Sequence, residues 1–318
     1  MRLAALDRVN YLNIALMISA AVIATVLPFE LFLFAYAILG PAHYLTQISW
    51  LHDRKYFTTG KYDFLLLVLL TLPIASRFTF GQWLPASIDW DGIFAAVALL
   101  AAAGMVYFKR VFHKLVLGVV AALCAAYVCQ VPDIALFFSL FLPTLIHVYV
   151  FTGAFILYGT LRSQSLSGWL SMAVFVSCGV CFFALDIPTW GYGVTEQIRT
   201  SMGRLVVIPQ EFIRVFGLSP EWDSVVDVMR FIAFAYTYHY LNWFSKTKVI
   251  RWHEIPRRRM LAIAFLYCLS VGIYAVKYEW GISVLFCLSL IHVFLEFPLN
   301  HRTFVGIGSH LRGALARP

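Results

Sequence analysis

The sequence predicts an all-α protein: a polytopic transmembrane helical bundle of about ten spans, forming one integral membrane domain over residues 1–318. Of the 318 residues, 61% are hydrophobic and only 13% are charged, whereas soluble domains carry about 25% charged residues. The mean hydropathy is +0.81. The apolar residues also occur in runs near the length of a bilayer span, not in the narrow stripe of a soluble helix. A soluble fold would therefore have too little polar surface.

Each predicted span is an apolar run that ends at a proline or at charged residues. The first five, with the break after each, are 10–28 (Pro28), 30–51 (Arg54, Lys55 and Lys61), 63–80 (Asp89 and Asp91), 92–108 (Lys109, Arg110 and Lys114) and 115–130 (Pro132 and Asp133). The second five are 134–160 (Arg162), 168–187 (the connection 188–223), 224–244 (the basic segment 246–259), 260–277 (Lys277 and Glu279) and 281–300 (the basic tail 302–317).

The connection 188–223 is the longest, and it differs from the others in composition. Its stretch 194–216 mixes basic and apolar residues at helical spacing, and Pro209 interrupts it. This pattern predicts an interfacial or re-entrant helix rather than another span. If the segment crossed the membrane, the orientation of every later span would be inverted.

Basic and base-poor loops alternate along the chain. With ten spans, every basic cluster except that in 188–223 falls on one side, which predicts cytoplasmic N- and C-termini, and we expect a bacterial inner membrane. The net charge of +8 is explained by these juxtamembrane residues. We therefore expect the lipid bilayer as a partner and no nucleic acid.

Four of the nine histidines lie inside predicted spans: His43, His147, His239 and His292. An imidazole in hydrocarbon is costly unless it is paired or metal-bound, so such residues are functional candidates. In the predicted topology all four spans run in the same direction. His43 and His292 each precede the cytoplasmic end by about eight residues, or about 12 Å. We therefore expect four imidazoles around one cavity in the cytoplasmic half.

Polar residues share a helix face with two of these histidines. Gln47 is four residues after His43, and Glu296 is four residues after His292. A carboxylate one turn from an imidazole can orient it or bind the same metal. Glu296 is therefore a candidate catalytic residue.

The other two histidines also have informative neighbours. His239 lies between Tyr238 and Asn242, which we treat as further catalytic candidates. Pro143 lies four residues before His147 and should free a backbone carbonyl there, opening the helix for a ligand or water.

Histidine nitrogens bind iron, zinc, copper and nickel, and a histidine–carboxylate set with open positions suits non-haem Fe(II) oxygen chemistry. The sequence therefore predicts a metal-dependent oxidoreductase or oxygenase, with Fe(II) held by the four intramembrane histidines and a lipophilic substrate arriving from lipid. A bis-histidine haem electron carrier is an alternative. A proton- or metal-coupled transporter or channel is another, and the histidines could also be packing residues.

The remaining histidines lie near the predicted boundaries. His52, His253 and His301 have the depth expected of interfacial anchors, and they could also extend the site toward a mouth. We interpret His113 and His310 as solvated.

In size, hydropathy and the scatter of the four intramembrane histidines, the chain resembles the membrane carotenoid-cleaving oxygenases of bacteria. The resemblance implies a multi-pass bundle with four histidines around one iron. It is architectural only, because the segments 40–43, 238–245 and 292–301 match no motif of that family. Membrane desaturases and hydroxylases resemble the chain less, since their HxxxH and HxxHH boxes are missing.

Overall fold

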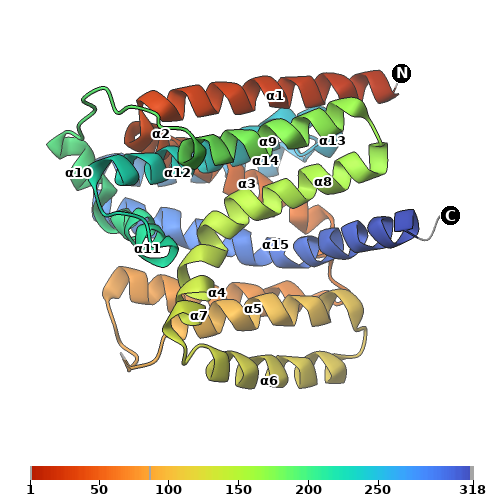
Figure 1. Ribbon diagram of the computed structural model, residues 1–318. Coiled ribbons are helices and arrows are strands. Elements are labelled where there is room, and N and C mark those ends of the chain that lie inside the picture. The colour runs from red at the N-terminus through yellow and green to blue at the C-terminus, as the bar shows by residue number, and fades with distance from the viewer. Residues whose placement is uncertain (1, 86, 316–318) are drawn as a thin grey trace. The chain divides into compact units, whose positions relative to one another are not determined.

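The computed structural model describes residues 2–85 and 87–315, and these form helices joined by loops, without β-strands (Figure 1). Within this part of the chain, nine helices are long and apolar enough to cross a membrane, and they coincide with nine of the ten predicted spans. The predicted all-α bundle of apolar helices is confirmed.

Contacts divide the chain into two compact units that alternate along the sequence. Unit 1 consists of Met1–Gly40, Val148–Arg251 and Ile307–Pro318, and unit 2 consists of Pro41–His147 and Trp252–Gly306. The interpretation of residues 1–318 as one membrane domain stays a prediction.

Unit 1 is built mainly from α1 (Arg2–Val26), α2 (Pro28–Phe34), the π-helix η1 (Ala35–Leu39), α8 (Thr152–Ser163), α9 (Leu166–Ala184), α10 (Glu196–Met202), the 3₁₀ turn η4 (Gly203–Val206), α11 (Val207–Phe216), α12 (Trp222–Ser245) and α13 (Thr247–Ile250). Unit 2 is built mainly from α3 (Gly40–Asp53), the 3₁₀ turn η2 (Lys55–Phe57), α4 (Asp63–Phe80), α5 (Trp90–Tyr107), α6 (Val111–Val128), α7 (Pro132–Leu136), the π-helix η3 (Phe137–Phe151), α14 (Arg257–Val276) and α15 (Tyr278–Leu315).

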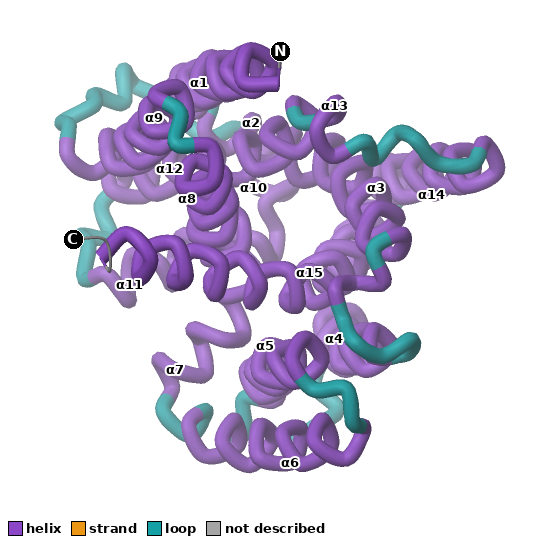
Figure 2. The backbone as a smooth tube through the Cα atoms, turned by 90° about the vertical axis from the view of Figure 1, so that its right-hand side faces the viewer, coloured by secondary structure: helices purple, strands orange, loops and turns teal. Residues whose placement is uncertain are grey.

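Helix α12 forms the centre of unit 1 and packs against α1, α2, α9 and α11 (Figure 2). It coincides with the predicted span 224–244 but is not among the nine apolar helices. Its stretch 236–243 carries tyrosine, threonine, histidine and asparagine. These polar side chains are buried by the surrounding helices, so α12 does not need an apolar surface.

Arg230 holds the start of the connection 188–223 onto α12. Its guanidinium donates hydrogen bonds to the backbone carbonyls of Thr25, Ile187 and Pro188 and to the carboxylate of Asp227, at 2.8–3.1 Å. Asp227 therefore balances the charge of Arg230. Because every donor group has a partner, a charge that is only 1% exposed can be tolerated.

The segment predicted to be interfacial does not form one long helix. It consists of α10, η4 and α11, and Gly203 at the first junction has a φ of +45°. Ile208, Phe212 and Ile213 are buried, and α11 packs on α12. Arg214 lies on the opposite face, where it pairs with Glu211 at 2.6 Å. None of the helices in 194–216 is among the candidate spans, and the interfacial position of the segment stays a prediction.

In unit 2, α4, α5 and α6 pack side by side in chain order (Figure 1). Helix α5 is rich in alanine, which lets its neighbours approach closely. At Gly92 the approach is closest, because a Cβ there would lie 2.7 Å from the carbonyl oxygen of Ala135. The ion pair Lys114–Asp63, at 2.6 Å, joins α6 to the start of α4.

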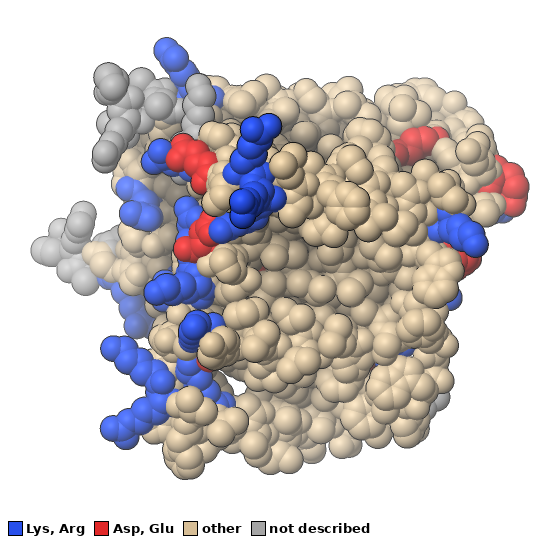
Figure 3. All heavy atoms as spheres, turned by 180° about the vertical axis from the view of Figure 1, so that it is seen from behind, with Lys and Arg blue, Asp and Glu red and all other residues tan. Residues whose placement is uncertain are grey.

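On the face shown in Figure 3, uncharged side chains make up most of the visible surface. A wide uncharged surface is expected where helices contact lipid. Composition, helix length and surface therefore agree on a multi-pass membrane protein.

Candidate metal centre

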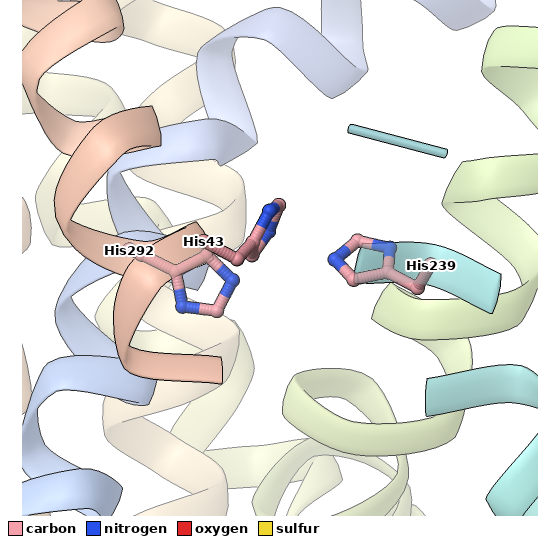
Figure 4. A group of neighbouring side chains, drawn as sticks. All are labelled: His43, His239 and His292. Carbon is pink, nitrogen blue, oxygen red and sulfur yellow. The ribbon is translucent and has the colours of Figure 1, made fainter. Parts of the chain in front are cut away.

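Three of the four predicted ligands form a cluster inside unit 2, which we call the histidine cluster: His43 on α3, His147 in η3 and His292 on α15. Each is only 1% exposed. The Nε2 atoms of His147 and His292 lie 3.0 Å apart. Nitrogens of His43 and His292 lie within 4.8 Å of each other, and these two rings are neighbours in Figure 4.

The rings meet edge to face. The centroids of His43 and His292 are 5.3 Å apart with an interplanar angle of 83°, and those of His147 and His292 are 4.9 Å apart at 79°. His292 therefore lies between the other two. Tyr44 stacks on the His292 ring, with centroids 4.3 Å apart and an angle of 22°, and it is fully buried. We assign Tyr44 a positioning role, because its ring restricts the rotation of the imidazole.

Two of the histidines lie in or beside π-helical backbone, and a proline explains each irregularity. Pro41 and Pro143 have no backbone N–H, so each interrupts the regular α-helical hydrogen bonds. The π-helix η1 ends directly before Gly40-Pro41, and η3 contains both Pro143 and His147. Such π segments occur frequently at functional sites, since they change the direction of side chains within a span. The predicted opening of the helix at Pro143 agrees with this backbone.

A buried carboxylate accompanies the cluster. The Gln47 side-chain amide donates a hydrogen bond to Glu296 Oε2, so the two polar residues one turn beyond His43 and His292 bind each other. Both are buried. No described group hydrogen-bonds to Glu296 Oε1 or to Gln47 Oε1. Buried oxygens of this kind normally have a partner, so they suit water or a ligand that completes the site.

The spacing of the nitrogens fits two ligands of one metal ion. For metal–nitrogen bonds of about 2.1 Å, ligand nitrogens at right angles are about 3 Å apart. The 3.0 Å between His147 and His292 matches this value. Axial ligands on opposite sides of a haem iron would need nitrogens about 4 Å apart, on rings facing each other across the macrocycle. The 3.0 Å between the Nε2 atoms of His147 and His292 is too short for that arrangement.

The fourth predicted ligand, His239, lies in unit 1 on α12 and is labelled in Figure 4. It is buried, and its Nδ1 lies 2.7 Å from the hydroxyl of Thr152 on α8. A hydrogen bond at one ring nitrogen sets the orientation of the other, as in many metal-binding histidines. That His239 shares a metal with the histidine cluster stays a prediction from the sequence.

The catalytic candidates Tyr238 and Asn242 face a different set of groups in unit 1. The hydroxyl of Tyr238 hydrogen-bonds to Asn13 Oδ1 at 3.1 Å and to Asn242 Oδ1 at 3.5 Å. His239 points instead to Thr152, because it follows Tyr238 by one residue and so projects from another side of the helix. Their catalytic roles stay predictions.

The boundary histidines have partners of their own. His301 Nε2 lies 2.7 Å from the backbone carbonyl oxygen of Leu99, which makes it a packing donor between α15 and α5. His52 is exposed beside Asp53. His113 and His310 are exposed, as predicted for solvated residues.

No protein-family model, curated protein or solved structure matches this chain. The functional interpretation therefore depends on the residues and the geometry described above.

Proposed function

We propose that the protein is a membrane-embedded, metal-dependent oxidoreductase that holds Fe(II) in the histidine cluster and acts on a lipophilic substrate. The observation that supports this proposal is the buried contact of three imidazoles from separate helices: the Nε2 atoms of His147 and His292 lie 3.0 Å apart, and nitrogens of His43 and His292 lie within 4.8 Å of each other. Burying imidazoles is costly in hydrocarbon, which makes intramembrane histidines candidates for function. We retain His239 as the fourth ligand, as predicted from the sequence.

The ligand set favours iron among the metals that imidazole binds. Neutral imidazoles with a nearby carboxylate and open positions suit Fe(II) and oxygen activation, which is the chemistry the metal would supply when bound. Glu296 would balance part of the positive charge, while Gln47 fixes its orientation. Tyr44 would hold the His292 ring in its binding orientation. The surrounding apolar helices would exclude water from the reaction.

A lipophilic substrate is favoured by the surface of unit 2. An open groove of about 620 Å³ lies between α14 and α15, and its walls are almost entirely apolar, with Leu269, Ile273 and Trp280 among them. Its size is typical of small-molecule sites. Since α15 also carries His292, an apolar molecule in this groove would contact the same helix as the metal.

Metal analysis of single-histidine variants tests the proposal. The protein purified in dodecyl maltoside should contain close to one iron per chain. His43→Ala, His147→Ala and His292→Ala should each lose most of it, whereas the exposed His113→Ala should keep it. An iron content that is negligible, or equal in all four variants, would contradict the metal centre.

The second candidate function is a transporter, which the buried Glu296 favours. A second measurement distinguishes an enzyme from such a transporter. Nitric oxide, a mimic of dioxygen, should bind the reduced iron at an open position and give an electron paramagnetic resonance signal of a non-haem iron–nitrosyl. A transport site fully coordinated by protein ligands should give none. A Soret absorption band would instead indicate haem.

We also propose cytoplasmic termini in a bacterial inner membrane, from the alternation of basic loops. Reporter fusions at the two ends of the chain should both be active on the cytoplasmic side. Opposite readings would require an odd number of spans, and the predicted common direction of the histidine-bearing spans would then be wrong.

A further inference from the structure

A cavity of about 180 Å³ that several polar side chains line lies wholly within unit 1 and shares no lining residue with the histidine cluster. It lies where α1 and α9 begin and α8 and α12 end, and Figure 1 shows the start of α1 and the α8–α9 connection at the same end of the unit. We call it the Lys246 pocket. The polar residues of its lining that bear on the argument are Asn10, Asn13, Ser163, Tyr238, Asn242 and Lys246.

Hydrogen bonds orient the amides of this pocket. Asn13 Oδ1 accepts from the hydroxyls of Tyr238 and Ser245, both at 3.1 Å, and its amide donates to the carbonyl of Val9 at 2.8 Å. Asn242 directs its own Oδ1 toward Tyr238. The NH₂ group of Asn242 is therefore on the other side of its side chain, and both Asn242 and Lys246 line the pocket.

Lys246 brings a positive charge without a carboxylate partner among the described residues. Burial lowers the pKa of its ammonium to about 8, because the charged form loses hydration. The nearest acidic residue on α1, Asp7, does not line the pocket and accepts a hydrogen bond from Ser167, which in turn accepts one from Asn10. A bound anion would compensate the charge that burial destabilises.

We propose that the Lys246 pocket binds a phosphate oxyanion, either in a phospholipid headgroup or free. A lysine ammonium and an oriented amide donor match the acceptor oxygens of phosphate. The pocket lies at the helix ends that carry Arg8 and Arg162, where headgroups are expected, and basic pockets between helices at this depth recognise anionic lipids. Leu6, Val9 and Phe155 add an apolar wall that suits the glycerol and first methylenes of a lipid.

Chemical protection of Lys246 tests the proposal on the wild-type protein. The amine should react with an acylating reagent at pH 8, with the extent measured by peptide mass spectrometry in dodecyl maltoside. Dihexanoyl-phosphatidylglycerol or inorganic phosphate should slow acylation of Lys246 at least about threefold, while the exposed Lys61 should not be protected. Dihexanoyl-glycerol, which lacks the phosphate, should protect neither. Protection by the lipid alone assigns a headgroup, and protection by both assigns the free anion as well.

Two variants complete the test. Lys246→Met should weaken binding of the effective probe at least about tenfold by calorimetry, whereas Lys246→Arg, which keeps the charge, should weaken it less, and Lys61→Met should leave it unchanged. If neither probe protects Lys246 in the wild type, or if Lys246→Met, eluting as a monodisperse species, binds as tightly as the wild type, the proposal is wrong.

Discussion

Replacing Glu296 by glutamine separates a metal centre from a packing cluster. Glutamine keeps the shape of the side chain and can still accept a hydrogen bond from Gln47, so the change removes mainly the charge. Glu296 follows His292 by one helical turn, about 6 Å of rise. Adding a metal–ligand bond of about 2 Å places its charge about 8 Å from a metal on His292.

The expected loss can be bounded from this distance. A single negative charge about 8 Å from a divalent ion, at an effective dielectric of about 20, contributes about 4 kcal/mol. This value is an upper limit, because water and neighbouring dipoles reorganise. Losing a group that supports metal ligands typically lowers affinity about 10–100-fold, or about 1.4–2.8 kcal/mol. We therefore expect Glu296→Gln to bind Fe(II) about 10–100-fold more weakly than the wild type.

Competition with a chelator of known affinity measures this loss in detergent-purified protein. The apparent melting temperature of the metal-free protein should stay equal or rise, since a buried charge is removed. Gln47→Leu is the complementary control: it removes the hydrogen bond to Glu296 but keeps the carboxylate, and it should weaken metal binding less than Glu296→Gln. Wild-type iron affinity in Glu296→Gln would refute the electrostatic reasoning and leave Glu296 as a packing partner of Gln47.

Three further predictions concern stability. Gly92→Ala should lower the free energy of unfolding by about 1–3 kcal/mol in chemical denaturation, because the added methyl group would meet the backbone of Ala135. Gly118→Ala is the control and should be neutral or stabilising, because a methyl group at Gly118 would lie in open space. Arg230→Met should lower the apparent melting temperature and expose the connection 188–223 to protease, since it leaves a carboxylate and three carbonyls without their donor, a loss of about 3–5 kcal/mol. With its folded pKa lowered to about 8, Lys246 binds fewer protons folded than unfolded, so stability should rise as pH increases from about 8 to 10; Lys246→Met should lose this slope.

Helix positions and candidate ligands could be predicted from the sequence because both depend on local composition. A bilayer needs apolar runs of a minimum length, so eight predicted spans agree with their helices to within about four residues, whereas the helix of the span 281–300 continues to Leu315. His43, His147 and His292 stood out because imidazoles are rare in such runs. One helical period placed Gln47 on the face of His43 and Glu296 on the face of His292, whereas the hydrogen bond between Gln47 and Glu296 was found only in the structure.

The partners of these residues depend on packing, which no local pattern specifies. Tyr44 escaped notice because an aromatic residue in a span is ordinary, and only the structure shows it stacked on His292. One indication was present in the sequence: Tyr44 directly follows His43, so its side chain leaves the same helix next to the imidazole and projects toward a neighbouring helix. Tyr238 and Asn242 were selected for their closeness to His239 along the chain, yet helical geometry directs them to the Lys246 pocket.

The burial of each span indicates which spans can accommodate histidines. The spans Val111–Val128 and Arg257–Val276 are only 11% and 6% buried and carry high hydropathies of 2.0 and 1.8, as contact with lipid requires. The span of His43, Pro28–Asp53, is 67% buried with a hydropathy of 1.3, and that of His292, Tyr278–Gly313, is 61% buried with a hydropathy of 2.1, so these two spans share their burial and not their hydropathy. Enclosure by other helices therefore permits imidazoles in these spans.

That these spans can accommodate buried imidazoles does not explain why the imidazoles are present. A buried polar cluster usually contributes no more stability than apolar side chains of similar volume would. Suppose that the cluster served packing alone. The double variant His147→Leu, His292→Leu would then lose two paired polar side chains, remain as stable as the wild type and bind no less metal than the wild type. Under the proposed function the same double variant should remain folded and lose its iron. The iron content of this double variant therefore tests whether the 3.0 Å contact between His147 and His292 serves function or only stability.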